Sequence, residues 1–283
     1  MTPRVQLHIL RVGACRHLEC MAARGGRWQS VEFPALCGLI QHPAHGWILY
    51  DTGYAEHFFK ATRHWPERLY GQTLPVDLPA SEHLTAQLSR KGIAAADISL
   101  VIVSHYHGDH IAGLRDFPNA RFIALKADTD HFMALTGHRW RATFGGHLPA
   151  LLPPDYGQRL LLADHCPQRD LPSWLHPFTR GFDLLNDGSL LGVPLPGHSL
   201  GQLGLFIPSP QGQPAFLIAD ACWSLPALRE GRLPSRLTTL ITADRHTFTR
   251  TFKGLERIAR SAACVHLLPS HCNHAWQEFQ HAH

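Results

Sequence analysis

The sequence lacks the features that mark membrane-spanning, exported or nucleic-acid-binding proteins. Its 283 residues contain no run of eighteen apolar residues, so no transmembrane helix is predicted. The first residues have no apolar stretch behind a basic start, so no secretory signal peptide is predicted. Lys and Arg number 26 against 22 Asp and Glu, and no basic run exceeds two residues. Neither a nucleic acid nor a membrane is therefore expected as a partner.

Cysteine is present but is not arranged for disulfides. The seven cysteines form no Cys-x-x-Cys pair, and an odd number is a poor basis for a disulfide framework. We therefore expect a reducing compartment and a cytoplasmic location. The cysteines are Cys15, Cys20, Cys37, Cys166, Cys222, Cys264 and Cys272.

Composition predicts an ordinary globular protein, because apolar residues make up 45% of the chain and charged residues 17%. The length allows one large or two small domains, but no repeat or linker is visible, so we expect a single domain over residues 1–283. The stretch from Thr136 to Phe182 is rich in Gly, Pro and aromatic residues and has no clear periodicity. We expect a loop or lid insertion at about 136–182, with a surface excursion held down by its aromatics as the alternative.

Short apolar runs bounded by Gly, Pro or Asp predict many strands. The predicted strands are Val5 to Leu10, Ala35 to Ile40, Trp47 to Tyr50, Leu100 to Val103, Arg121 to Leu125, Leu190 to Leu195, Leu203 to Ile207, Ala215 to Ile218 and Val265 to Leu268. Two amphipathic segments predict outer helices, Ser81 to Lys91 with Ser81 as N-cap and Gly92 as terminator, and Phe248 to Ser261. Strands interleaved with helices predict a layered α/β protein with mixed sheets.

Histidine is the residue in excess, with 22 copies, and imidazole is the commonest metal ligand in proteins. An apolar strand runs directly into the string SHYHGDH at residues 104–110. At positions i and i+2 of an extended segment, His105 and His107 point to the same side and suit one ion. Gly108 would let the backbone turn tightly, after which Asp109 and His110 suit a second ion close by.

The alternative is a polar loop whose histidines are unrelated to a metal. Packing after a buried strand does not need four imidazole or carboxylate groups, which argues against that alternative. Imidazole-rich ligation favours zinc, and the added carboxylate also admits iron, manganese or cobalt. The string therefore predicts a site for divalent cations.

The HxHxDH string after a strand resembles the metallo-β-lactamase superfamily. Four further motifs carry the resemblance in the family's order, and together they span about residues 35 to 271. They are LYDTG around Asp51, PGHSLG around His198, FLIAD ending at Asp220 and LLPSH ending at His271. The resemblance implies an α/β fold, the four-layer αββα sandwich with two mixed sheets.

The resemblance also implies a dinuclear site for two divalent metal ions. The implied ligands are His105, His107 and His198 for the first ion, Asp109, His110 and His271 for the second, and Asp220 as a bridge between them. Asp51 is implied to orient a ligand histidine through a hydrogen bond. Cys222 and Cys272 flank two of these residues, but the ligand set is full without them, so we interpret both as small packing residues.

Within the superfamily the chain is similar to the lactonase-like branch, which includes enzymes that open N-acyl homoserine lactones. The oxygen-reducing di-iron branch has Glu where His107 stands. The glutathione-thioester hydrolases have a C-terminal extension, whereas only twelve residues follow His271 here. The nucleases of the superfamily carry RNA-binding domains or a basic exosite, and its secreted β-lactamases carry a signal peptide. None of these features is visible in this chain.

One position departs from the lactonase pattern. Those enzymes have a Tyr just after the bridging Asp, and its hydroxyl contacts the substrate carbonyl, whereas this chain reads Asp220-Ala221-Cys222-Trp223. Trp223 is expected to contact the substrate through its indole N–H or as a flat apolar wall, and it lacks the phenol's acceptor and acid. This departure puts specificity for acyl homoserine lactones in question.

The predicted function is that of a metal-dependent hydrolase that cleaves a lactone, ester or thioester. Two divalent ions would share a water, lower its pKa and supply a hydroxide that attacks a polarised carbonyl. Asp109 would carry a proton to the leaving group, and Asp220 would hold the two ions. The alternatives are a phosphodiesterase at the same site and a non-catalytic binding or regulatory member of the fold.

The expected partner is a small molecule with an acyl or aromatic part. Its binding is assigned to the 136–182 segment and to an aromatic region that comprises Phe58, Phe59, Trp65 and Tyr70. The expected assembly is either a monomer or a homodimer.

Overall fold

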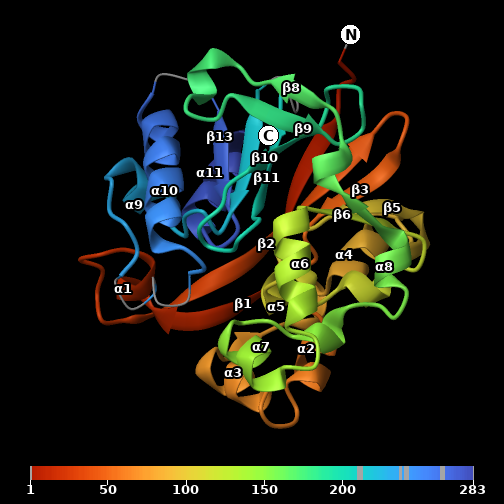
Figure 1. Cartoon of the computed structure of the whole chain (residues 1–283), viewed down its shortest axis with the longest axis vertical. Helices are drawn as coiled ribbons and strands as arrows, with labels where there is room; N and C mark the ends of the chain where they lie inside the picture. Colours follow the sequence, from red (N-terminus) through yellow and green to blue (C-terminus); the bar gives the residue numbers. More distant parts are fainter. Residues whose placement is uncertain (1, 209–212, 236–237, 239–241, 262–264, 283) are drawn as a thin grey trace.

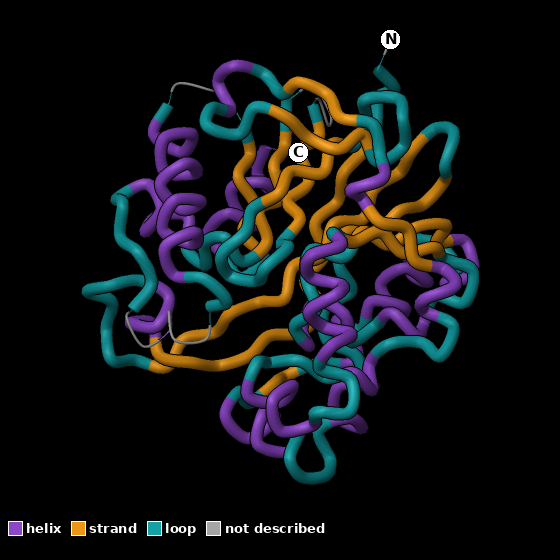
Figure 2. Tube along the Cα trace, in the orientation of Figure 1, coloured by secondary structure: helices purple, strands orange, loops and turns teal. Residues whose placement is uncertain are grey.

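The structure is a computed structural model that describes residues 2–208, 213–235, 238, 242–261 and 265–282. Two β-sheets pack against each other, and helices cover their outer faces (Figures 1 and 2). This confirms the predicted α/β sandwich with two mixed sheets. Of the helices in the described ranges, none is long and apolar enough to cross a membrane.

The first sheet has the strand order β4-β1-β2-β3-β5-β6-β7. Its strands are β1 (Gln6–Leu18), β2 (Ser30–His42), β3 (Gly46–Tyr50), β4 (Val76–Asp77), β5 (Ile98–Ile102), β6 (Arg121–Ala124) and β7 (Leu160–Leu162). Strands β1, β2 and β3 pair antiparallel, whereas β3, β5, β6 and β7 pair parallel. Parallel strands end at the same edge, so the loop after β5 opens at the carboxyl edge of this sheet.

The second sheet has the order β13-β12-β11-β10-β9-β8. Its strands are β8 (Gln168–Asp170), β9 (Arg180–Asp183), β10 (Leu191–Pro194), β11 (Leu203–Ile207), β12 (Ala215–Ala219) and β13 (His266–Pro269). The pair β12 and β13 is parallel and the other pairs are antiparallel. The loops after β12 and β13 therefore leave the sheet at one edge, next to each other.

The helices fill the outer layers. They are α1 (Glu19–Ala22), α2 (Glu56–Ala61), α3 (Arg68–Thr73), α4 (Leu84–Arg90), α5 (Gly108–Ile111), α6 (Lys126–Ala134), α7 (Arg139–Phe144), α8 (Tyr156–Arg159), α9 (Leu225–Arg229), α10 (Arg245–Arg260) and α11 (Asn273–Ala282). Figure 1 shows α9, α10 and α11 beside the second sheet and α4, α6 and α8 beside the first.

Alternation along the strands separates two cores. In β5, Leu100 and Ile102 face the core shared with the second sheet, whereas Val101 packs with the outer helices. This is the period-2 pattern expected when both faces of a strand are covered. The apolar stripe of α10 joins the first of these cores through Phe248, Phe252, Leu255 and Ile258.

Both predicted helices exist, but their starts differ from the prediction. Ser81 lies inside a 3-10 turn (Ala80–Glu82) instead of capping α4, while Gly92, with φ +74°, follows the helix end as expected. α10 begins three residues earlier than predicted, because the Asp244 carboxylate accepts the backbone N–H groups of His246 and Thr247.

The stretch at 136–182 was expected to be irregular, and the structure differs. It contributes α7 and α8, the edge strands β7 and β8, and most of β9, which lies between β8 and β10. Strands of three or four residues hold too few alternating positions to be recognised from sequence. Conversely, β1 and β2 are thirteen residues each and extend well beyond the predicted runs.

Candidate metal centre

The structure brings all seven predicted metal-site residues to one end of the two sheets, in two groups. The first group is His105, His107, His198 and Asp220, and the second is Asp109, His110 and His271, with the candidate ligand atoms of each group within 4.8 Å of one another. The loop after β5 and the adjoining α5 supply four residues, and the loops after β10, β12 and β13 supply one each. Both sheets are therefore required to assemble the site.

Distances in the first group fit a cation bound by three imidazoles. His107 Nδ1 lies 3.1 Å from His105 Nε2 and 3.0 Å from His198 Nε2. Tetrahedral zinc with bonds near 2.0–2.1 Å places its ligand nitrogens about 3.3 Å apart. The prediction that His105 and His107 point to the same side is confirmed, and His198, 91 positions after His107, joins them.

In the second group, His271 Nε2 lies 3.3 Å from Asp109 Oδ2, and His110 Nε2 lies 3.8 Å from Asp109 Oδ1. Asp220 stands between the groups. Its Oδ2 lies 3.3 Å from His198 Nε2, whereas its Oδ1 lies 3.3 Å from His110 Nε2 and 3.2 Å from His271 Nε2. One carboxylate oxygen thus faces each group, as a bridging ligand requires.

Unpartnered buried atoms support a cation at the second group. Within the part of the chain that the structure describes, His110 Nε2 and Asp220 Oδ1 are buried without a well-oriented hydrogen bond, although they lie 3.3 Å apart as an ion pair. Buried polar atoms are rarely left unpaired, because each costs about 1–3 kcal/mol. Both atoms point to the same place, and a divalent cation there would satisfy them, so the residues present fit the metal that the sequence predicts.

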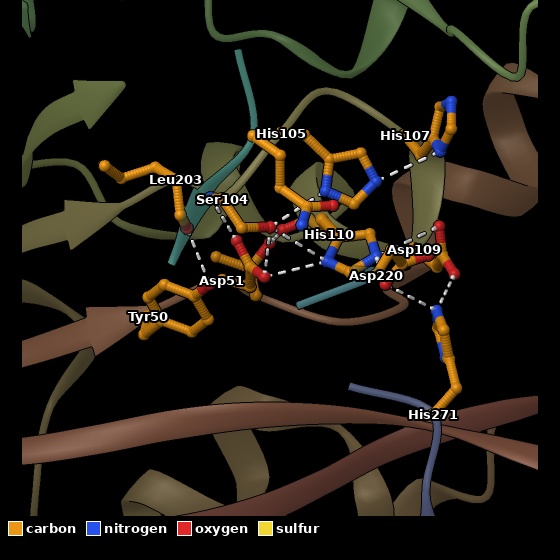
Figure 3. A network of polar contacts seen from close by, with 12 residues as sticks. Tyr50, Asp51, Ser104, His105, His107, Asp109, His110, Leu203, Asp220 and His271 are labelled. Atoms are coloured by element: carbon orange, nitrogen blue, oxygen red, sulfur yellow. Dashed lines mark hydrogen bonds and ion pairs between the residues drawn. The ribbon is translucent and has the colours of Figure 1, made fainter. Parts of the chain in front are cut away.

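Asp51 orients His110 through the ring nitrogen that faces away from the metal site (Figure 3). Its Oδ2 lies 2.8 Å from His110 Nδ1 and accepts the Ser104 hydroxyl at 2.7 Å, and its Oδ1 accepts the Ser104 backbone N–H at 2.7 Å. His110 donates through Nδ1, so Nε2 is the nitrogen that can give up its proton to a cation and bind it. Asp51 holds a left-handed backbone with φ +60°, a strained conformation that is typical of functional sites.

The other ring nitrogens and the backbone are also held in place. His271 Nδ1 donates to the carbonyl of Pro34 at 2.7 Å, which leaves its Nε2 free to bind a cation. Gly197, which precedes His198, has φ +127°. It packs so closely against α10 that an added Cβ would lie 2.2 Å from the Phe248 backbone nitrogen. Gly108 was expected to serve a tight turn. Instead it opens α5, and its added Cβ would lie 3.2 Å from the Phe58 and Tyr70 rings, so close packing explains it.

Replacement of Asp51 by Asn should weaken metal binding at the second group. An amide offers only one acceptor atom, so its NH₂ would face either Ser104 N–H or His110 Nδ1–H. Loss of such an outer hydrogen bond lowers metal affinity about 10–100-fold. Competition with a chromophoric chelator measures the effect. The control is Asp116→Asn, because Asp116 pairs with His57 at 2.8 Å outside both metal groups, and an equal loss in both variants would contradict the assignment.

The histidines of the two groups differ in pKa and therefore in protonation state. Burial lowers the pKa of His107 to about 3 and the pKa of His198 to about 4, so both rings are neutral at pH 7. For His271, burial is outweighed by the Asp220 and Asp109 carboxylates, which raise its pKa to about 8. The same balance, with Asp109 first among the carboxylates, raises the pKa of His110 well above its usual value.

A cation must displace protons from the second group but not from the first. Between pH 5 and 8 we expect binding at the first group to release no proton, because its imidazoles are already neutral. Binding at the second group should release one proton each from His110 and His271. Its apparent affinity should fall as pH decreases below about 8, by about tenfold per pH unit for each proton. Calorimetric titration in two buffers of different ionisation enthalpy measures this, and proton release with the first equivalent would contradict it.

A cavity of about 460 Å³ opens over the two groups. The floor includes His107, Asp109, His198, Asp220 and His271. The walls are mostly apolar and come from β1, α1, β2, α3, α7 and the loop after β12; they include Met21, Ala22, Phe33, Leu69, Tyr70, Leu74, Phe144 and Trp223. The site is thus a metal-binding floor beneath an apolar chamber, which suits a small molecule with a hydrocarbon part.

Only part of these walls was predicted. Tyr70 and residues 143–146 line the cavity as expected, but Phe58, Phe59 and Trp65 are not among the described lining residues. The contributions of His17, Met21 and Phe33 were missed. They lie on the extensions of β1 and β2 and the short helix between them, and only the length of those strands could have indicated that they reach the site.

Cys222 and Cys272 pack as predicted. Each is buried, and neither belongs to a metal-ligand group found among the described residues. Cys272 Sγ instead accepts the backbone N–H of Leu225 at 3.3 Å, and Cys222 Sγ donates to the carbonyl of Ser224 at 3.6 Å. Cys264 lies outside the described residues.

A further cluster of His42, His45 and Asp187 is built differently. His42 Nδ1 accepts the backbone N–H groups of Ala44 and His45, each at 3.1 Å, so the proton of the neutral ring sits on Nε2. That nitrogen lies 3.0 Å from Asp187 Oδ2. A cation would have to displace this proton and leave an imidazolate, so the cluster is a His–Asp link between the β2–β3 and β9–β10 turns.

Comparison with known proteins gives one family. The sequence profile of the Metallo-beta-lactamase superfamily matches residues 31–209. The chain is 26% identical over 283 residues to the N-acyl homoserine lactonase AttM of Azorhizobium caulinodans, with 98% of this chain and 97% of the relative covered. It is 30% identical over 210 residues to the N-acyl homoserine lactonase AiiB of Agrobacterium fabrum, with 72% and 70% covered.

Solved structures show the same fold. A mutant of AiiA from B. thuringiensis with N-decanoyl-L-homoserine bound at the active site superposes with a TM-score of 0.70 at 19% identity, over 99% of this chain and 97% of that one. AidC, a dizinc quorum-quenching lactonase in complex with its product, superposes with a TM-score of 0.62 at 19% identity, over 97% and 90%. At such identities the likeness concerns the fold alone.

Proposed function

The chain belongs to the metallo-beta-lactamase superfamily and is a metal-dependent hydrolase, and we propose that it hydrolyses a lactone, ester or thioester with an apolar acyl part. One observation carries the proposal. Two groups of candidate metal ligands share the Asp220 carboxylate on the floor of an apolar cavity. This arrangement joins a site for water activation to a site for a hydrocarbon chain.

The walls support an acyl chain as the recognised part of the substrate. Phe33, Leu69 and Phe144 line the cavity from three different elements. Each methylene buried there contributes about 0.8 kcal/mol to binding. The relatives named N-acyl homoserine lactonases act on a lactone with an acyl chain, so a molecule of that type is the first candidate substrate.

The bound cations, for which zinc is favoured by the histidine-rich ligand set, would supply a water of lowered pKa and a Lewis acid for the carbonyl oxygen. Asp220 fixes the separation of the two groups, because one of its oxygens faces each. Asp109 lines the cavity with its side chain 13% exposed, so its carboxylate can take a proton and deliver it to the leaving oxygen.

The test is turnover by metal-reconstituted protein of acyl homoserine lactones with short and long acyl chains, an aryl ester, an acyl thioester and a bis-aryl phosphate. We expect the carbonyl substrates to be hydrolysed, with KM decreasing as the acyl chain lengthens. Hydrolysis of the phosphate diester alone, or no turnover with two metal ions bound, would overturn the proposal.

A further inference from the structure

Trp223 makes a specific contact with the metal centre instead of facing the cavity with its polar atom. Its indole Nε1–H donates to Asp220 Oδ2 at 2.9 Å. Its ring stands edge-to-face on His198, with 5.6 Å between ring centroids and 88° between the planes. The same ring lines the cavity. Trp223 therefore contacts two candidate ligands of the first group and the space for the substrate.

The oxygen that accepts this hydrogen bond is the one facing the first group, since His198 Nε2 lies 3.3 Å from it. A carboxylate oxygen has two lone-pair directions, so one can accept an N–H while the other binds a cation. Asp220 Oδ1 faces the second group, where it lies 3.3 Å from His110 Nε2 and 3.2 Å from His271 Nε2. The indole thus fixes the rotation of the carboxylate from one side and leaves both metal-facing lone pairs available.

The chain around Trp223 holds the indole in this position. Ser224 caps α9 by accepting the backbone N–H of Ala227 at 3.3 Å. Cys222 is buried and bonds the Ser224 carbonyl. Ala219, just before Asp220, has a left-handed φ of +46°. The turn from the end of β12 into α9 is therefore fixed at both ends, and the indole has little freedom to turn toward a substrate.

We propose that Trp223 is a positioning residue that holds the bridging carboxylate of Asp220 through its indole N–H and presents only its apolar ring to the substrate. This inference rests on the proposed function, because it assumes that Asp220 bridges two cations. A substrate carbonyl then receives no hydrogen bond from this position. The part of the substrate beside the scissile bond meets a flat apolar wall there.

Two substitutions separate the N–H from the ring. Trp223→Phe keeps an aromatic ring and removes the donor. Trp223→His keeps a donor, because the imidazole Nε2–H overlays the indole Nε1–H, and removes the larger ring. The matched control is Trp276→Phe, because the Trp276 indole donates to the carbonyl of Ile9 at 3.3 Å and Trp276 belongs to neither metal group.

The measurement is titration of each metal-free full-length protein with Co²⁺, followed by visible absorption, with circular dichroism to verify folding. For Trp223→Phe we expect the first equivalent to bind about 10–100-fold more weakly, with an altered cobalt spectrum. Trp223→His and Trp276→Phe should bind within about threefold of the parent, a difference of under 0.7 kcal/mol. If Trp223→Phe fails to fold, Trp223→His alone decides, since a loss of affinity there contradicts a role for the N–H.

The outcomes distinguish this inference from the function on which it rests. A parent protein that binds no Co²⁺ overturns the proposed function. A parent that binds two equivalents, with Trp223→Phe indistinguishable from it, overturns the positioning role alone. Equal weakening in Trp223→Phe and Trp223→His also overturns it, because the bulk of the indole would then be the cause.

Discussion

Removal of bound metal by a chelator is expected to abolish turnover, with a loss of at least about 10³-fold, or about 4 kcal/mol of transition-state stabilisation. The physical reason is that bound cations would both lower the pKa of the attacking water and polarise the substrate carbonyl, and the histidines and carboxylates of the cavity floor would be engaged as their ligands. Turnover of the substrate identified in the assay above, measured before and after dialysis against the chelator, tests this. Full activity in the chelated protein would exclude a metal-dependent reaction.

The same experiment has a second readout in stability. A ligand that binds only the folded protein adds about 2.7 kcal/mol at a concentration 100 times its dissociation constant. In a chain of this size such a change shifts the melting temperature by about 5 °C or more. Adding back Zn²⁺, Co²⁺, Mn²⁺ or Fe²⁺ separately should restore both activity and melting temperature, and the ion that restores them best identifies the preferred metal.

Asp220→Asn should have the largest effect of any single isosteric substitution, with kcat/KM reduced by about 10³-fold or more. Each carboxylate oxygen of Asp220 faces one metal group. An amide keeps one acceptor oxygen and turns an NH₂ toward the other group, where its protons would oppose a cation. Metal content by elemental analysis should decrease from two equivalents toward one.

The control for this substitution is Asp130→Asn. Asp130 is an exposed residue of α6 that pairs with Lys126 on the surface, so the same chemical change there should leave activity and metal content unaltered. Asp220→Asn protein that keeps both metal equivalents and parental activity would show that the carboxylate does not bridge.

Some elements could be predicted because their signals are local. The strand before residue 104, the i, i+2 spacing of His105 and His107, and the apolar stripe of α10 are all properties of short windows. The order of the later motifs around His198, Asp220 and His271 added the family and with it the two mixed sheets, and both are confirmed.

Other elements could not be predicted, because their signals are weak or distant. The short strands β7, β8 and β9 have three or four residues each and leave almost no periodicity. The start of α10 was missed for another reason: Asp is a favoured N-cap residue, but the apolar stripe that predicted the helix begins only at Phe248, four residues after Asp244. The walls from β1 and β2 reach the cavity only because both strands extend far beyond the apolar runs that identified them.

The sequence by itself determined which residue types gather at the site, in what order, and hence which metals and which family they suit. The tertiary structure alone decided how these residues face one another. It placed one oxygen of Asp220 against each group, turned the Trp223 N–H onto that carboxylate, and formed the cavity from segments of both sheets. The reason is that ligand identity is encoded in short motifs, whereas distances between loops far apart in the chain are set by how two sheets pack.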